Sequence, residues 1–125
     1  MALTYSKLMD IAVLPYSSTL ALSSCQPIYI NPASTVSYVS EIEIHNTSSS
    51  SNASVALFLV PNLSGNTGTV AMSCETVRLT LSAYDTVFIE PKYPYVLTSI
   101  NDAFFGVASL STVNISLRGG KDISW

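Results

Sequence analysis

The sequence predicts an all-β fold: a single-domain antiparallel β-sandwich of jelly-roll type. Apolar and polar residues alternate in roughly eight to ten short segments, about 8–12 residues apart. Gly, Pro, Asn and Ser separate these segments, and turns favour these residues. No stretch has the sustained 3.6-residue repeat of an amphipathic helix. The chain has 125 residues, which is the length of one domain that buries about two-thirds of its unfolded surface.

The first residues differ from the rest of the chain. Leu14-Pro15-Tyr16 interrupts any helix that starts before it, because proline lacks the N–H donor a helix needs. We expect residues 1–17 to form an extended N-terminal arm with a short strand at 11–14, and residues 18–125 to form the sandwich. An ordinary edge strand of the same domain is the alternative.

Two short alternating segments follow at residues 19–22 and 27–30. The sequence Asn31-Pro-Ala-Ser34 then predicts a turn, in which Pro32 presets φ.

The strongest strand pattern, at residues 36–61, is interpreted as a β-hairpin joined by a serine-rich loop at 45–54. In the first arm, residues 36–46, the side chains alternate as in a strand with one buried and one solvated face. The apolar parity consists of Val36, Tyr38, Ile42 and Ile44, and the polar parity of Glu41, Glu43 and His45. The second arm, residues 55–60, is apolar on both parities, as expected of a strand covered on both sides.

The remaining segments complete the predicted sandwich. A turn-rich loop at 62–68 precedes a candidate short strand at 69–73. Residues 76–82 alternate, with Val77, Leu79 and Leu81 inward and Arg78 and Thr80 outward. Further strands are expected at 86–90, 95–100, 103–110 and 112–118. Pro91 and Pro94 interrupt the sheet because proline cannot donate to a ladder, and Gly119-Gly120 is expected to end the last strand and leave 121–125 as a tail.

The charge content bears on function. Only 10% of residues are charged, against about 25% in a typical domain. No apolar run reaches the roughly 18 residues that span a membrane, and a hydrophobic content of 48% is ample for a folded core. We therefore expect much of the surface to be buried against other subunits. The net charge of −3, with five scattered basic residues, argues against nucleic-acid binding. No signal peptide is recognisable, which indicates synthesis in a cytoplasm without secretion.

Four segments, in this order, resemble a recurrent small all-β protein of tailed-phage virions. Tyr29-Ile-Asn-Pro-Ala-Ser-Thr35 resembles a strand and a Pro-Ala-Gly-Thr turn, with Ser34 in place of the usual glycine. Val39-Ser-Glu-Ile-Glu-Ile-His-Asn-Thr47 is similar to V-x-x-I-x-I-x-N-T, and Val55-Ala-Leu-Phe-Leu-Val-Pro61 to V-x-L-x-L-V-P. Val113-Asn-Ile-Ser-Leu-Arg-Gly119 is similar to the closing strand, so that the resemblance spans residues 27–123.

The resemblance implies a virion accessory protein that is made in the host cytoplasm and resides in the virion. The expected function is that of a capsid cement or decoration protein, and the alternative is a neck, fibre or baseplate component. We expect a homo-oligomer, most simply a trimer, that binds the major capsid protein or other virion proteins. The resemblance carries over no catalytic residue and no cofactor.

Candidate interface residues lie in the N-terminal arm and in a tyrosine- and proline-rich segment. An apolar arm can add a strand to the sheet edge of a neighbour, and tyrosine offers interfaces both apolar area and a hydroxyl group. The candidates are Leu3, Tyr5, Leu8, Ile11, Val13, Tyr84, Tyr93 and Tyr95. Core packing is the alternative for the tyrosines. A host-glycan-binding module that stacks sugars on Tyr93 and Tyr95 is a third hypothesis.

An enzyme is not expected. His45 is the only histidine, no nucleophile motif accompanies it, and exposure to solvent or a pH-sensitive subunit contact is the expected role. Glu41 and Glu43 lie about 7 Å apart on one strand face, which is typical of a solvated surface. The sequence contains no acidic loop of the kind that binds calcium. Cys25 and Cys74 lack the spacing of metal ligands, so reduced thiols are expected, with a disulfide as the alternative.

Overall fold

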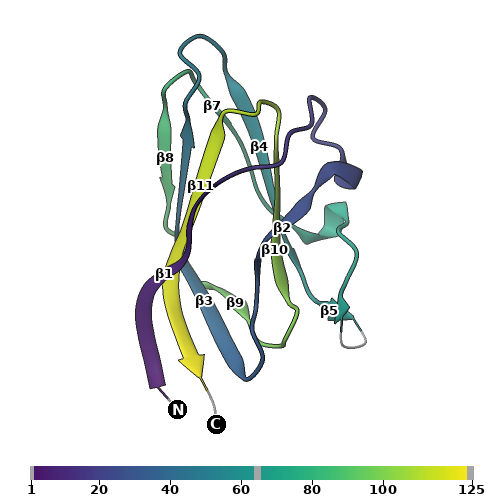
Figure 1. The fold of residues 1–125 in the computed structure, drawn as a ribbon, viewed down its shortest axis with the longest axis vertical. Coiled ribbons are helices and arrows are strands. Elements are labelled where there is room, and N and C mark those ends of the chain that lie inside the picture. Colours follow the sequence, from purple (N-terminus) through teal and green to yellow (C-terminus); the bar gives the residue numbers. More distant parts are fainter. Residues whose placement is uncertain (1, 64–65, 124–125) are drawn as a thin grey trace.

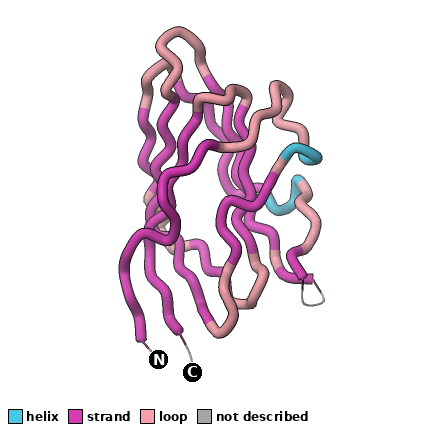
Figure 2. The backbone as a smooth tube through the Cα atoms, in the orientation of Figure 1, coloured by secondary structure: helices cyan, strands magenta, loops and turns pink. Residues whose placement is uncertain are grey.

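Two antiparallel sheets pack face to face in the computed structural model, which describes residues 2–63 and 66–123 (Figures 1 and 2). The first sheet runs in the order β1 (Ala2–Val13), β11 (Val113–Ile123), β3 (Thr35–Asn46) and β8 (Thr86–Ile89), and β9 (Tyr95–Leu97) also pairs with β3. The second sheet runs in the order β2 (Gln26–Ile30), β10 (Ala103–Ala108), β4 (Ala53–Val60) and β7 (Glu75–Leu81). The smaller elements are β5 (Asn62–Leu63), β6 (Asn66–Thr67) and the 3-10 helices η1 (Leu22–Ser24) and η2 (Met72–Cys74).

The strand pairs are nested along the chain. The innermost pair is β4 with β7, followed by β3 with β8, β2 with β10 and β1 with β11. All four pairs are antiparallel, and they alternate between the two sheets. One long folded ribbon has thus been wound around a common core, which is the jelly-roll arrangement. The predicted antiparallel sandwich is confirmed.

The predicted hairpin at residues 36–61 is wrong in its pairing. Both arms are strands, but β3 belongs to the first sheet and β4 to the second. The pattern of alternation predicts a strand and its buried face, but it does not identify the strand's neighbour. The six residues between β3 and β4 instead cross from one sheet to the other, and packed sheets lie about 10 Å apart.

The strand β3 changes its buried face at Ser40. Its ladder with β11 pairs Glu41 with Arg118 but Val39 with Gly119, so one residue of β3 is extra. On the Val39 side of this bulge the odd-numbered residues are buried, and on the other side the even-numbered ones are. The predicted inward positions of Val36 and Tyr38 are therefore wrong, because a one-residue insertion moves every following side chain to the opposite face.

Of the two alternatives for the first residues, the structure has the edge strand. Ladder pairs join β1 to β11 from Ala2–Ile123 to Val13–Asn114, and Leu8 and Leu14 lie in the core between the sheets. The candidate strands at 19–22 and 69–73 are wrong, since these segments lead into η1 and η2.

Two apolar clusters stabilise the fold. The larger lies between the sheets and includes Ile42, Ile44, Leu57, Phe104, Ile115 and Leu117. The smaller lies on the outer face of the second sheet, where Phe58, Val60, Phe105 and Val107 are covered by residues around η1 and η2. Strand β4 contributes to both clusters, which confirms the prediction that it is covered on both sides. Cys25 and Cys74 belong to the outer cluster and are free thiols.

The last strand is longer than predicted. Gly119 and Gly120 do not end β11, which continues to Ile123 and pairs with both β1 and β3 over this stretch. As a result, the start of β1 and the end of β11 lie beside each other at one end of the molecule (Figure 1).

Candidate functional site

The outer face of the first sheet is covered by no other element of the described chain. Two rows of outward side chains cross it. The upper row is Val13, Asn114, His45 and Thr86, in which each residue is the ladder partner of the next. The lower row is Ser116, Glu43 and Phe88, and Ile11 lies beside Ser116 within a register shift of β1.

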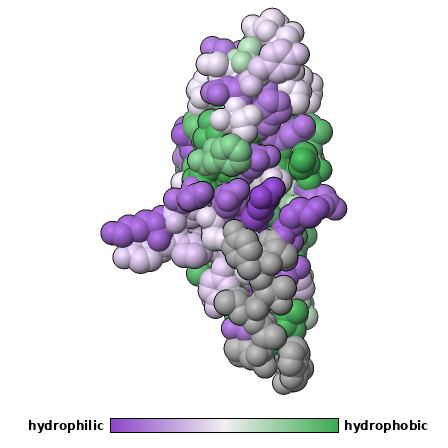
Figure 3. All heavy atoms as spheres, turned by 90° about the vertical axis from the view of Figure 1, so that its left-hand side faces the viewer, coloured by the Kyte–Doolittle hydropathy of each residue, from purple (hydrophilic) through white to green (hydrophobic). Residues whose placement is uncertain are grey.

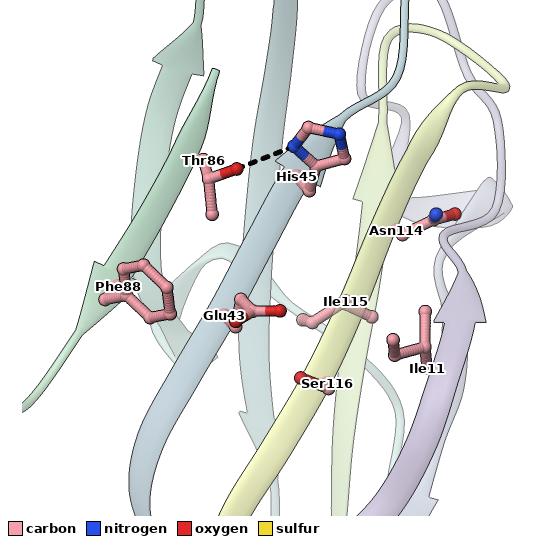
Figure 4. Close-up of a pocket in the computed structure, with 8 residues that line it drawn as sticks. All are labelled: Ile11, Glu43, His45, Thr86, Phe88, Asn114, Ile115 and Ser116. Atoms are coloured by element: carbon pink, nitrogen blue, oxygen red, sulfur yellow. Dashed lines mark hydrogen bonds between the residues drawn. The ribbon is translucent and has the colours of Figure 1, made fainter. Parts of the chain in front are cut away.

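A groove of about 430 Å³ runs over this face (Figure 4). Its lining comes from four strands and consists of Ile11, Glu43, His45, Thr86, Phe88, Asn114, Ile115 and Ser116. Ile11 and Phe88 come from the two edge strands β1 and β8, and the polar residues between them come mainly from β11 and β3. Figure 3 views this face and shows hydrophobic areas on its two sides with hydrophilic atoms between them.

The groove exists because side-chain size varies across the sheet. The walls are large and exposed, with 67% of Ile11 and 59% of Phe88 accessible to solvent. The floor contains the small side chain of Ser116, which is buried beneath its neighbours. A polar floor between apolar walls fits a partner group that has an apolar body and a polar tip.

The polar side chains of the groove differ in their hydrogen bonding. His45 is fixed by a bond of 2.7 Å between its Nδ1 and the Oγ1 of Thr86, drawn as a dashed line in Figure 4. Within residues 2–63 and 66–123, the side chains of Glu43, Asn114 and Ser116 form no hydrogen bond. Glu43 is an acceptor when ionised, whereas the Asn114 amide and the Ser116 hydroxyl both donate and accept. The floor therefore has free hydrogen-bonding capacity of both kinds.

Apart from Tyr95, which is half-buried, the structure separates the predicted interface residues into three groups. The side chains of Leu3 and Tyr5 lie outside the described residues, although their backbone belongs to β1. Leu8 is only 7% exposed and packs in the core of its own chain. The accessible candidates are Ile11 and Val13 on β1, Tyr84 between β7 and β8, and Tyr93 between β8 and β9.

The tyrosine pair Tyr93 and Tyr95 does not form a flat platform. Tyr95 packs edge-on against the buried ring of Phe104, with ring centroids 5.8 Å apart and an interplanar angle of 63°. Tyr93 is 74% exposed, and the ammonium group of Lys92 lies 5.6 Å from the centre of its ring. The two rings therefore have different environments: Tyr95 is half-buried against the core, and Tyr93 is exposed.

Buried polar residues fix the two ends of the sandwich. At one end the Asn31 amide donates to the carbonyl oxygens of Thr35 and Ser99, and the Asp102 carboxylate accepts backbone N–H groups of Asn62, Thr98 and Ser99. At the other end the Asn46 side chain bonds to Ser48, Ser51, Ser82 and Thr112. These residues hold loops in place and do not line the groove.

Two ionisable side chains that lie outside the groove, Cys25 and Asp10, have shifted pKa values. Burial raises the pKa of the Cys25 thiol, while the charge of Arg78 opposes this shift. On β1, Lys7 donates a hydrogen bond of 2.8 Å to Asp10 and lowers the pKa of that carboxyl group. This exposed ion pair lies on the edge strand itself.

Sequence reasoning missed Phe88, Asn114 and Ser116. A signal for Phe88 was present, because Val87 and Ile89 are inward and the aromatic ring between them has to face outward. Asn114 and Ser116 occupy the same outward parity on β11, but only the strand order places them beside Glu43 and His45.

Within the described residues, no helix has the length and apolar content to cross a membrane. The same part of the chain contains no group of three or more His, Cys, Asp or Glu residues that could hold a metal ion. No family model and no curated protein sequence matches this chain.

Proposed function

We propose that this chain is a structural protein of a tailed-phage particle that assembles as a homo-oligomer and acts as a capsid cement or decoration protein. In this function it binds the major capsid protein across seams between capsid subunits and stabilises the shell. Placement in the neck, fibre or baseplate is the alternative, and it differs in which virion protein the oligomer contacts.

The observation that carries the proposal is the uncovered outer face of the first sheet, in a chain with few charges. Ile11, Val13 and Phe88 are large apolar residues on this face, and each is more than half exposed. Large apolar side chains exposed at both edges of an uncovered sheet face support contact with another protein. Jelly-roll domains are common in viral capsid proteins, and this supports the proposal only by analogy of fold.

The edge strand β1 favours contacts through faces over the strand addition expected from the sequence. One side of β1 is already paired with β11. Two register shifts and the exposed Lys7–Asp10 ion pair disturb its other side, and such features prevent edge-to-edge pairing. Small contacts repeated over several subunits would then supply avidity for the capsid.

The glycan-binding hypothesis has less support. A sugar platform needs exposed, coplanar rings, whereas Tyr95 packs against Phe104. No second candidate function is therefore put forward for that pair.

The first test is the mass of the full chain in solution, measured by light scattering at two concentrations. We expect a homo-oligomer, most simply a trimer, and a monomer at both concentrations would contradict the proposal. Deletion of residues 1–17 is unsuitable as a variant, because it removes an edge strand and the core residues Leu8 and Leu14.

The second test is co-sedimentation of the purified protein with capsids and, separately, with tails of the parent particle. Saturable binding to capsids that raises their resistance to heat supports the cement function. Binding to tails alone would favour the neck, fibre or baseplate alternative, and binding to neither would reject both.

A further inference from the structure

We propose that the groove on the first sheet of one copy receives Tyr93 and Lys92 of a second copy. This inference rests on the proposed homo-oligomer and names the contact that builds it. The occupant is the 91–94 loop between β8 and β9. Tyr93 in this loop is exposed, and no other described element covers it.

The chemistry of tyrosine matches the groove. Lys92 lies over one face of the Tyr93 ring, and Phe88, the ladder partner of Glu43, offers apolar surface to the other face as a wall of the groove. The tyrosine hydroxyl group needs a partner when buried, and Glu43 in the groove has a carboxylate free to accept that hydrogen bond. The groove volume of about 430 Å³ lies in the range of about 300–1,000 Å³ typical of sites that hold one compact group.

Charge complementarity selects Tyr93 over the other exposed tyrosines, Tyr16 and Tyr84. Lys92 lies over the Tyr93 ring, so a positive charge enters the groove region together with the ring and meets Glu43. Tyr84 is similarly exposed, but its neighbour in the chain is Asp85, whose carboxylate would face Glu43 with like charge. Among the exposed tyrosines that the structure describes, only Tyr93 has a cation over its ring.

The conformation of the loop is also restricted before binding. Pro91 and Pro94 flank Lys92 and Tyr93, and a proline restricts φ at its own position and the conformation of the residue before it. A restricted loop loses less conformational entropy when it docks.

The contact is heterologous, because the loop and the groove are different surfaces of the same chain. A heterologous contact forms a closed ring when the rotation between neighbours closes, and a three-membered ring is the trimer expected from the sequence. Every subunit then offers one loop and fills one groove.

The test begins with four full-length proteins: the original chain, Tyr93→Ala, Asn114→Trp and the control Tyr84→Ala. Asn114→Trp fills the groove from a half-buried surface position, and Tyr84→Ala removes an exposed ring that the proposal does not use. We expect Tyr93→Ala and Asn114→Trp each to raise the dissociation constant of the oligomer by about 30-fold or more, as for a hot-spot tyrosine. Tyr84→Ala should leave it unchanged. Thermal unfolding of each variant checks that the fold is retained.

Mixing supplies a readout that a folding defect cannot mimic. Tyr93→Ala keeps an intact groove and Asn114→Trp keeps an intact loop, so an equal mixture should form dimers through one complete contact. A mixture that remains monomeric, from variants that are folded, would overturn the proposal.

Charge reversal gives an independent check. Lys92→Glu and Glu43→Lys should each weaken the oligomer by about 10-fold or more, and the double variant should recover most of this loss. If the original chain is a monomer, both the proposed function and this inference fail. If the original chain is an oligomer that tolerates Tyr93→Ala, only this inference fails, and the groove belongs to a different partner.

Discussion

Gly119 lies so close to the backbone of Tyr38 that a Cβ atom on Gly119 would be 1.6 Å from the Tyr38 carbonyl oxygen. This contact occurs where the ladder between β11 and β3 shifts by one residue. The bulge at Ser40 brings the two backbones together, and glycine is the residue that allows this approach. A residue that looked like a strand terminator in the sequence is thus required inside the strand.

Gly119→Ala should destabilise the protein by about 3 kcal/mol or more, since backbone atoms have to move to admit the methyl group. The matched variant is Gly106→Ala, whose Cβ would lie 2.6 Å from the Cδ2 of Leu14, the mobile end of a side chain. Gly106→Ala should cost less, about 1–2 kcal/mol. Urea unfolding of the two variants measures the difference, and equal costs would contradict this account of the bulge.

Asn46→Ala should destabilise the protein by about 2–3 kcal/mol, because it leaves buried partners without a hydrogen bond. The amide of Asn46 donates to the carbonyl oxygens of Ser51 and Ser82, and its oxygen accepts from Thr112. The exposed residue Asn52 is the control, and Asn52→Ala should change the free energy of unfolding by less than about 0.5 kcal/mol. Equal unfolding midpoints for the two variants would show that the Asn46 bonds do not hold the loops.

Tyr84→Gly should stabilise the chain by about 0.5–1 kcal/mol. Tyr84 has a φ of 58°, a left-handed conformation that costs residues with a Cβ more than glycine. Tyr84→Ala keeps the Cβ and removes the ring, so it should bring no gain. The melting temperatures of both variants at one protein concentration check this, and a gain in the alanine variant would assign the effect to the ring.

The stability of the protein should fall as the pH rises above about 8.5, where the thiol of an unfolded cysteine titrates. Burial raises the pKa of Cys25, so the folded state favours the neutral thiol while the unfolded state releases its proton earlier. This contribution is therefore complete below the unfolded pKa and is lost as the pH approaches the raised folded pKa. Unfolding in urea at pH values from about 7 to 10 measures the decline.

Cys25→Ala isolates this effect from the titration of tyrosines and lysines. The variant should lose less stability between neutral and alkaline pH than the original chain does. In the same samples, the half-buried Cys74 should react with a thiol reagent before the buried Cys25. Parallel pH profiles for the two proteins would argue against a role of the Cys25 thiol.

The local features of the fold were largely predictable from the sequence, because alternation depends on neighbouring residues. Residues 76–82 illustrate this: Val77, Leu79 and Leu81 are more buried than Arg78 and Thr80, as predicted. The pairing of strands was not predictable in the same way. Residues 36–46 and 55–61 are close in the chain and suit a hairpin, yet their strands belong to different sheets because longer-range contacts determine their partners.

The groove could not be predicted from the sequence for a related reason. Its lining residues lie near positions 11, 43–45, 86–88 and 114–116, and only the strand order β1-β11-β3-β8 makes them neighbours. His45 and Glu43 were recognised as outward residues, but nothing in the sequence indicates which side chains lie beside them. Likewise, the partial burial of Tyr95 and the exposure of Tyr93 follow from the short strand β9, which the sequence predicts only approximately.

The nested pairing of strands has a consequence for biosynthesis. Val13 and Asn114 are ladder partners about 100 residues apart, so β1 leaves the ribosome long before β11 exists. At about 5–20 residues per second, this delay lasts roughly 5–20 s. During that time both edges of β1 lack a partner and are open to wrong pairing with other nascent chains. The charged side chains of Lys7 and Asp10 on β1 oppose such pairing while the chain is unfinished, and they continue to protect the free edge of β1 in the folded protein.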